Sequence, residues 1–201
     1  DAALDSGDLK TASRLMAGLV TPPEGSDGFE WDLRRARVAI FTVDVDRGVE
    51  LLKQLLASND RDWDPQQVDR FLQVVFDLQT LQYHQQALLL FDALLHKRLE
   101  QRQRRELLFW MADSSQALEQ YDQAAYLYLK SATLLDQAAM DPWAQTARYR
   151  AAKVLVEAGL LEDARQIYAS LLHATRDASR KAVLNNEIQR LHLVTAVKNK
   201  E

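Results

Sequence analysis

The same spacing of apolar positions returns five times along this chain. Each run opens at a small residue, and bulky residues follow it four and usually seven positions later. Positions i, i+4 and i+7 share one face of a helix, so each run predicts an amphipathic helix. The opening residues stand at intervals of 36, 39, 37 and 40 and are Ala12, Gly48, Ala87, Ala124 and Ala164. A period of this length is typical of a stacked repeat architecture.

A second apolar pattern precedes most of these marker residues and predicts a second helix in each unit. Twelve residues before the marker stand Ala36, Val75, Ala112 and Ala152. Each unit is therefore expected to be an antiparallel helix pair. We expect helices at about 1–5 and 8–20, 29–42 and 45–57, 65–80 and 83–97, 103–118 and 121–137, and 142–158 and 161–174. A last helix near 177–196 has one apolar face, formed by Leu184, Ile188 and Leu191, and could cap the array.

The repeat resembles the tetratricopeptide repeat (TPR) family over nearly the whole chain. The match is clearest between residues 152 and 171, where seven positions have the residue types that the family places there. These residues are Ala152, Leu155, Gly159, Leu161, Ala164, Tyr168 and Leu171. The resemblance implies an all-α, right-handed superhelical solenoid. The chain departs from the family in its longer units, in the missing proline near each unit's end, and in certain turn and marker residues. The family's turn glycine is replaced by Val43, Gln82 and Glu119, and its marker alanine is replaced by Gly48.

We expect one solenoid domain over residues 1–201. Its units span about 1–20, 29–57, 65–97, 103–137 and 142–174, with the capping helix at 177–196. The first unit lacks most of its first helix, which suggests that the chain is part of a longer protein. Pro22 and Pro23 cannot lie inside a helix, and we interpret their segment as a solvent loop rather than a domain boundary.

Composition narrows the function classes. The formal net charge of −4 argues against a general nucleic-acid or anionic-membrane surface, which normally needs a basic excess. The chain has no cysteine, which removes disulfides and thiolate chemistry. No apolar stretch is long enough to span a bilayer. The absence of cysteine and the abundance of Gln, Arg and Ala suggest a bacterial protein, without choosing between cytoplasm and periplasm.

No pattern of residues indicates catalysis, a cofactor or a metal. Asp60, Asp62 and Asp64 resemble the start of a calcium loop, but Pro65 and Phe71 occupy the places of its glycine and glutamate. We instead expect an acidic turn that caps the helix beginning near Pro65. The four histidines lack zinc-type spacing. We therefore predict a protein that is not an enzyme and has no cofactor.

The densest basic run comprises Lys97, Arg98, Arg102, Arg104 and Arg105. The other units do not repeat this charge, as a surface that tracks a nucleic-acid backbone would need. We interpret the run as a solvated segment between helices, with an acidic protein partner as the alternative.

The first helix of each pair lines the concave groove in TPR arrays, and the resemblance therefore implies a set of groove residues. They are Arg34, Arg37, Phe76, Gln79, Trp110, Asp113, Gln116, Tyr149, Arg150 and Lys153. Aromatic anchors with Arg, Asp and Gln suit a bound peptide or helix. For Phe76, Trp110 and Tyr149, packing between units is an equal alternative.

One family subtype holds a peptide's terminal carboxylate with a lysine and asparagines at set groove positions. Here the lysine place is held by Leu33, Leu72, Phe109 and Tyr149, and the asparagine place by Arg37, Phe76, Asp113 and Lys153. This clamp is therefore missing, and co-chaperone activity of that kind is not expected.

The sequence thus predicts a scaffold that binds a protein or peptide in its groove, of unknown identity. Fold alone does not give function, and two alternatives stay open. One is a sensor or dimerisation segment of a larger regulatory protein, for which a homodimer is the expected assembly. The other is an accessory segment of a bacterial envelope or polysaccharide-export assembly that contacts saccharide through Trp110, Tyr149 and arginines.

Overall fold

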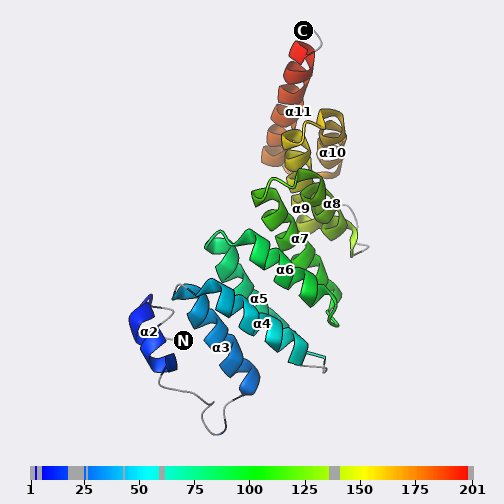
Figure 1. The fold of residues 1–201 in the computed structure, drawn as a ribbon. Helices are drawn as coiled ribbons and strands as arrows, with labels where there is room; N and C mark the ends of the chain where they lie inside the picture. Colours follow the sequence, from blue (N-terminus) through cyan, green and yellow to red (C-terminus); the bar gives the residue numbers. More distant parts are fainter. Residues whose placement is uncertain are drawn as a thin grey trace. The chain divides into compact units, whose positions relative to one another are not determined.

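The computed structural model is built from helices alone wherever the structure describes the chain (Figure 1). The helices are α2 (Leu9–Ala17), α3 (Gly28–Phe41), α4 (Val45–Ser58), α5 (Pro65–Thr80), α6 (His84–Leu95), α7 (Gln101–Ala117), α8 (Tyr121–Thr133), α9 (Pro142–Glu157), α10 (Leu161–Ala174) and α11 (Ala178–Lys198). The described residues are 3, 6–17, 25, 27–42, 44–58, 62–135 and 141–198.

The helices predicted from α3 onward are confirmed, with most boundaries within two residues. Helix α6 ends at Leu95, two residues before the predicted end, and the amides of His96 and Lys97 bond to carbonyls three residues back and tighten the last turn. One predicted end was wrong, because α8 ends at Thr133 instead of continuing to 137. The predicted helix at 1–5, the end of the one at 8–20 and most of the loop at 21–28 lie outside the described residues.

Six of the described helices, α2, α3, α4, α5, α9 and α11, begin directly after an aspartate whose side chain accepts a backbone N–H. Asp27 accepts from Phe29, and Asp141 accepts from Trp143. Asp64 accepts from the amide of Gln67 at 2.8 Å, and the Gln67 side chain accepts from the amide of Asp64 at 3.1 Å. This reciprocal capping box, with a proline at the start of α5, confirms the capping role predicted for Asp64. Asp60 lies outside the described residues.

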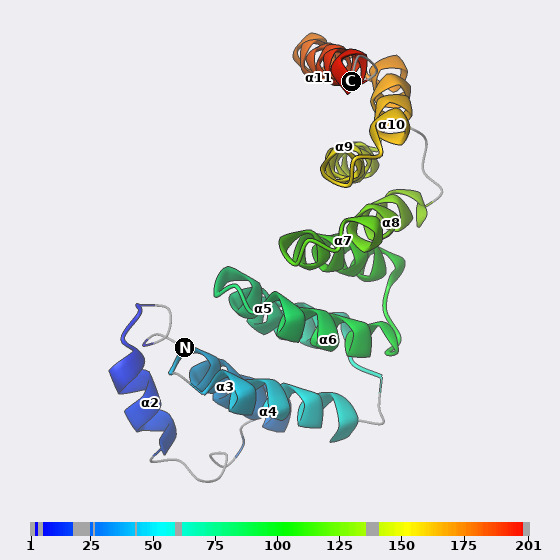
Figure 2. The same ribbon diagram turned by 45° about the horizontal axis from the view of Figure 1, so that its top comes forward.

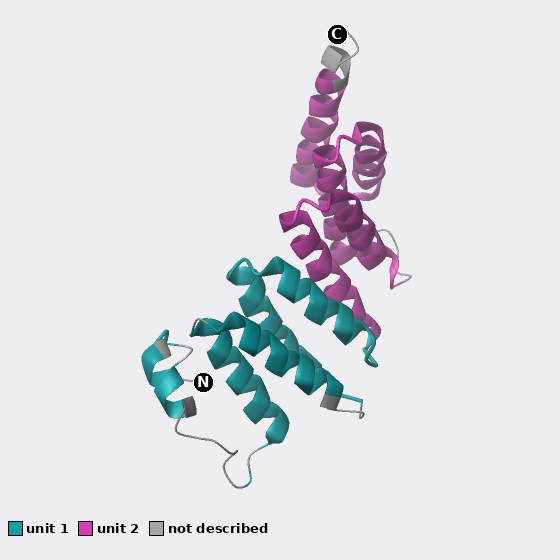
Figure 3. Ribbon diagram, in the orientation of Figure 1, with its two compact units in different colours: residues 1–100 teal, residues 101–201 magenta. Residues whose placement is uncertain are grey.

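The chain divides into two compact units, residues 1–100 and 101–201 (Figure 3). In the first unit, α3 pairs with α4, α5 pairs with α6, and α5 also contacts α3 (Figure 2). In the second unit, α7 packs on α8, α8 on α9, α9 on α10 and α10 on α11. The single domain expected over residues 1–201 stays a prediction.

The marker residues lie where two helices approach closely. Ala87, Ala124 and Ala164 are completely buried. Gly48, the exception in the series, lies on α4 opposite α3. A Cβ atom added there would stand 2.6 Å from the Ile40 Cγ1 atom and 2.9 Å from the Ala36 carbonyl oxygen. The α3–α4 pair therefore has glycine at the marker position because its two helices leave no room for a methyl group.

The turn inside three helix pairs contains a residue in the left-handed region at the same repeat position. Gly159 has a φ of 79°, while Gln82 and Glu119 have φ values of 67° and 59°. Residues with a Cβ atom seldom adopt this conformation. The left-handed conformation of Gly159 is therefore also adopted at Gln82 and Glu119, where the equivalent residue has a side chain. Val43 lies outside the described residues.

Helix α11 packs on α10 through the apolar face that the sequence predicted. Leu184 and Leu191 are buried and Ile188 is half-buried. Its other face is less polar than expected, because Leu193 is 70% exposed and Val194 is also exposed. Among the helices that the structure describes, none combines the length and the apolar character needed to cross a bilayer.

Candidate functional site

The ten expected groove residues all lie on the first helices of the pairs, and they fall into two sets. The first unit contributes Arg34 and Arg37 from α3 and Phe76 and Gln79 from α5. The second unit contributes Trp110, Asp113 and Gln116 from α7 and Tyr149, Arg150 and Lys153 from α9. Each set is described within its own unit, and one continuous groove along both stays a prediction.

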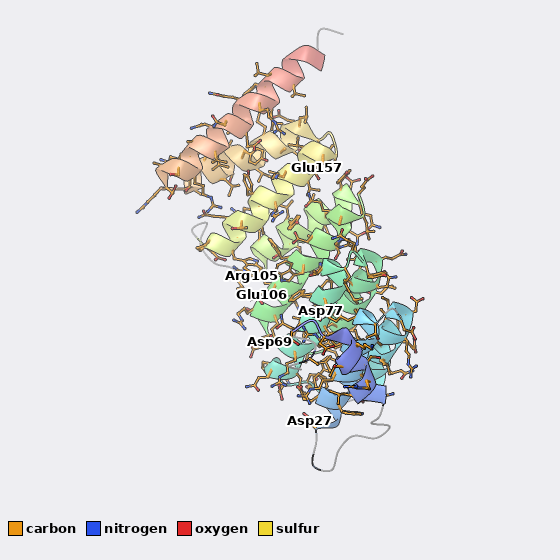
Figure 4. All side chains as sticks on the ribbon, turned by 90° about the vertical axis from the view of Figure 1, so that its left-hand side faces the viewer. Asp27, Asp69, Asp77, Arg105, Glu106 and Glu157 are labelled. Carbon is orange, nitrogen blue, oxygen red and sulfur yellow. The ribbon has the colours of Figure 1, made fainter. Side chains whose placement is uncertain are left out.

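Two ion pairs join α3 to α5 in the first unit. The Arg37 Nε atom donates to the Asp77 Oδ2 atom at 2.7 Å, and the Arg70 Nη1 atom lies 2.5 Å from the Glu30 Oε1 atom. Both pairs link residues 40 apart, so the two helices run in the same direction. Asp69 and Asp77, two turns apart along α5, are labelled in Figure 4. The two ion pairs stand seven residues apart on each helix and fix α3 beside α5.

A cleft of about 260 Å³ lies between α3 and α5. Its lining includes the apolar residues Leu33 and Val74, both buried, at 5% and 3% exposure. The Arg34 side chain, 44% exposed, also lines it, and one of its terminal nitrogens lies 3.9 Å from the Glu30 Oε2 atom. The remaining lining residues are Glu30, Arg37, Asp69, Arg70 and Gln73. The cleft thus combines apolar and charged groups, as side-chain binding pockets commonly do.

Phe76 lies on α5 but packs within its own helix pair. It is half-buried, and its ring centroid is 6.2 Å from that of Phe91 on α6. Gln79, one turn further along α5, is also half-buried. Of the four expected residues in this unit, the structure brings Arg34 and Arg37 together in the cleft.

In the second unit, a hydrogen-bond network connects α7, α8 and α9. The Tyr128 ring on α8 is fully buried, and its hydroxyl donates to the Asp113 Oδ1 atom. The Tyr128 hydroxyl oxygen also lies 3.2 Å from the Gln116 Oε1 atom, and the Gln116 amide donates to the Glu157 Oε2 atom at 3.0 Å. Burial, followed by the hydrogen bond to Asp113, raises the pKa of Tyr128 far above its usual value. This hydroxyl is therefore a stable donor at neutral pH.

A second pair of tyrosines joins α9 to α10. The ring centroids of Tyr149 and Tyr168 are 5.7 Å apart, with Tyr168 buried and Tyr149 half-buried. Burial raises the pKa of both hydroxyls, and the negative charge of Glu187 on α11 raises it further. Both hydroxyls are thus neutral at physiological pH.

The other expected residues of this unit differ in exposure. Trp110 is half-buried and packs edge-on against Phe109, with ring centroids 5.5 Å apart. Arg150 and Lys153 on α9 are exposed. The unit therefore offers two exposed cations on α9, while its aromatic residues also pack against the core.

The interpretation of the basic run as a solvated segment between helices was wrong for Arg105, which is buried on α7. Arg105 is 8% exposed, and its Nη1 atom lies 2.6 Å from the Asp141 Oδ2 atom. Its guanidinium also lies over the Trp143 ring, 5.4 Å from the centroid. Lys97 lies near the Trp63 ring in the first unit, at 5.8 Å. Arg105 is buried because it joins the start of α9 to α7, and Figure 4 labels it on α7.

Sequence reasoning missed the partners of the expected residues. Arg37 was aligned with Phe76, because the markers Gly48 and Ala87 are 39 residues apart, yet it pairs with Asp77, 40 residues away. Gln116 likewise bonds to Glu157, 41 residues away, where the markers Ala124 and Ala164 are 40 apart. In both cases the partner stands one residue after the position that is equivalent in the next repeat. Asp77 and Glu157 could therefore have been found by counting forward by the distance between the two markers plus one residue.

No grouping of three or more possible metal ligands occurs among the residues that the structure describes. A further cleft of about 560 Å³ lies in the second unit, on α8, α9 and α10. Its lining includes Leu129, Leu155 and Ile167 with Arg148 and Asp163, and none of the expected residues belongs to it.

Solved structures with a similar fold come from TPR-like repeats. Nearly identical TPR-like repeats assigned to a kinesin light chain of Podosopora anserina match with a TM-score of 0.61 and 16% identity, over 86% of this chain and 89% of that one. A glutamine-to-methionine variant of those repeats gives a TM-score of 0.60 and 16% identity, over 86% and 88% of the two chains.

This likeness confirms the predicted fold, an all-α TPR-like solenoid. No protein-family model matches the sequence, and no curated protein matches it. Because the identity is low, the likeness extends to the fold alone. The predicted bacterial origin stays a prediction.

Proposed function

We propose that this chain with a TPR-like fold is a non-enzymatic scaffold that binds a segment of another protein along its first helices. The fold is one whose stacked helices offer extended surfaces for partners. The first helices carry exposed Arg34, Arg150 and Lys153 beside half-buried aromatic residues. Aromatic and arginine side chains are the residues that most often supply binding energy at protein interfaces.

The cleft between α3 and α5 is the observation that carries this proposal. Its volume of about 260 Å³ suits one or two side chains of a bound segment, and Leu33 and Val74 give it apolar surface. The ion pairs Arg37–Asp77 and Glu30–Arg70 hold its two helices in place. A preformed site lowers the entropy lost on binding. Helical or extended segments are bound in such grooves by side chains at regular spacing.

Selection from a display library of random peptides tests this function. Peptides that bind the purified chain are synthesised, and their Kd values are measured by calorimetry. We expect binding in the micromolar range and about tenfold weakening when Arg34→Ala and Lys153→Ala are combined. Both side chains are exposed, so thermal stability is expected to stay unchanged.

Arg35→Ala is the matched control for this selection. Arg35 lies next to Arg34 on α3, is 36% exposed and pairs with Asp32 at 3.6 Å, but does not line the cleft. This variant should bind the selected peptides as tightly as the original chain. A selection that enriches no peptide, or peptides whose binding ignores both Arg34 and Lys153, would contradict the proposed function.

A further inference from the structure

We infer that the cleft formed by α8, α9 and α10 (the α8–α10 cleft) binds one face of a helix from another protein. That face carries an acidic and a basic side chain two turns apart, with apolar side chains between them. The surface is separate from that of the proposed function, because none of the ten expected groove residues lines this cleft. It is therefore a second place at which a partner binds.

The lining residues of this cleft stand two helical turns apart on two antiparallel helices. Arg148 and Leu155 are seven residues apart on α9, as Asp163 and Ser170 are on α10. These helices pack on each other and are joined by a short turn, so residues equally distant from Gly159 lie at the same level. Arg148 is therefore level with Ser170, and Leu155 is level with Asp163. At about 1.5 Å per residue, the two levels are about 10 Å apart.

The cleft has a positive side chain at one level and a negative side chain at the other. Arg148 is half-buried and Asp163 is exposed, and neither side chain has a hydrogen-bond or ion-pair partner among the residues that the structure describes. Their levels lie too far apart for a direct ion pair, and salt screens the remaining attraction. Asp163 is in the first turn of α10, where it stabilises the helix and keeps its carboxylate in solvent. Each charge can therefore pair with an opposite charge on a partner.

All three helices contribute an apolar side chain to the cleft. Leu155 on α9 is 8% exposed, whereas Leu129 on α8 and Ile167 on α10 are half-buried and keep surface for a partner. Tyr126, three residues before Leu129, is 60% exposed and extends the apolar surface of α8. A segment seated in the cleft covers these side chains, which favours apolar residues on its facing side.

The spacing of the two charges selects a helix as the partner. Positions i and i+7 of a helix lie about 10 Å apart on one face, which sets an acid against Arg148 and a base against Asp163. Positions i+3 and i+4 lie between them on the same face and can meet Ile167 and Leu129. In an extended segment, side chains on one face are about 7 or 13 Å apart, and neither distance fits.

Selection from a phage library of single helices with one randomised face tests this inference. The selection uses the Arg34→Ala, Lys153→Ala chain, so that binding along the first helices is weakened, and Kd values are then measured with the original chain. The enriched helices should share an acid and a base seven residues apart, with apolar residues between them. In a synthetic helix, changing the acid to Gln should raise the Kd about tenfold, because Arg148 is half-buried. Changing the base to Gln should raise it about threefold, because Asp163 is exposed.

Variants of the chain test the same contacts from the other side. Arg148→Gln should weaken binding about tenfold, whereas Arg150→Gln is the matched control. Arg150 is two residues further along α9, is exposed and does not line the cleft, so its variant should bind as tightly as the original chain. Arg148→Glu combined with Asp163→Arg should reject the selected helix and bind a helix whose acid and base are exchanged.

Several outcomes would overturn the inference and leave the proposed function standing. These are a selection that enriches no helix, enriched helices without the charge pair, and a charge preference that survives in the Arg148→Gln chain. Self-association of the original chain that Arg148→Glu abolishes, measured by sedimentation, would assign the cleft to a second copy instead. Since the changes to Gln are also made in the synthetic helix, the original chain decides the question even if a variant does not fold.

Discussion

The helix pairs α5–α6 and α7–α8 place different chemistry at the same two repeat positions. In the first pair, Phe76 stands eleven residues before the marker and Phe91 four after it, and their rings are 6.2 Å apart. In the second pair, the same places hold Asp113 and Tyr128, and the tyrosine hydroxyl donates to the carboxylate. At these two positions, α5–α6 makes an aromatic contact and α7–α8 makes a hydrogen bond.

This comparison shows that the side chains at the two repeat positions must match each other chemically. A carboxylate against an aromatic ring without a hydroxyl would lose solvent and gain no hydrogen bond. A tyrosine hydroxyl buried without an acceptor would be equally costly. The two positions should therefore change together, and exchanging one side chain alone should be unfavourable.

The largest expected effect comes from Phe76→Asp. The substitution removes ring packing and sets a carboxylate beside Phe91, so we expect a loss of about 2–4 kcal/mol in the free energy of unfolding. Adding Phe91→Tyr should recover about 1–2 kcal/mol, because the new hydroxyl can donate to the carboxylate. Urea unfolding of the original chain, both single variants and the double variant measures this coupling. Strictly additive effects would contradict the matching rule.

The reverse test removes the hydroxyl from the second pair. Tyr128→Phe leaves Asp113 and Gln116 without this donor, and we expect a loss of about 1–2 kcal/mol in the free energy of unfolding. Tyr126→Phe on the same helix is the control, since Tyr126 is 60% exposed and should tolerate the change. Thermal and urea unfolding of both variants provide the measurement. Equal stability of the two variants would show that the hydroxyl contributes nothing.

A smaller effect is expected at alkaline pH. Burial raises the pKa of Tyr128 and Tyr168 above the value of about 10 in an unfolded chain. Their contribution to stability is therefore complete below about pH 10 and decreases as the pH rises above that value. The Tm should fall as the pH rises above about 10, and less steeply in a Tyr128→Phe, Tyr168→Phe variant than in the original chain. Parallel slopes for the two proteins would argue against these tyrosines as the cause.

The smallest effect concerns a feature that both pairs share. Gln82 and Glu119 adopt left-handed backbone conformations at the turns of α5–α6 and α7–α8. Replacing either by glycine should stabilise the chain by up to about 1 kcal/mol, because glycine adopts positive φ without steric cost. Gly159→Ala should cost a similar amount. Calorimetric Tm values check this prediction, and a lower Tm for both glycine variants would refute it.

The fold could be predicted from the sequence because helical periodicity depends on local spacing. The markers Ala87, Ala124 and Ala164 are buried as their spacing requires. The positions of the turns could also be predicted, since Gln82 and Glu119 occupy the glycine position of the repeat. The predicted end failed at α8, which ends at Thr133 although the sequence predicted a helix to 137.

The candidate site was less predictable, because its contacts join residues on different helices. Arg34 and Arg37 were found by register, but Glu30 and Arg70 follow from how α3 and α5 lie against each other. Periodicity also gave Tyr128 a core position without revealing that its hydroxyl reaches Asp113. Arg105 shows the same limit, since a run of basic residues does not indicate which of them meets an aspartate such as Asp141.

Gly48 has a consequence for engineering this chain by consensus. Averaging the repeats would replace this glycine with alanine, a change that usually favours a helix. Here the added methyl group would meet the Ile40 side chain at 2.6 Å and the Ala36 carbonyl oxygen at 2.9 Å. Helices α3 and α4 would have to separate, and α3 carries Arg34 and Arg37. A regularised version of the chain should therefore keep the irregular glycine if it is to keep the shape of the cleft.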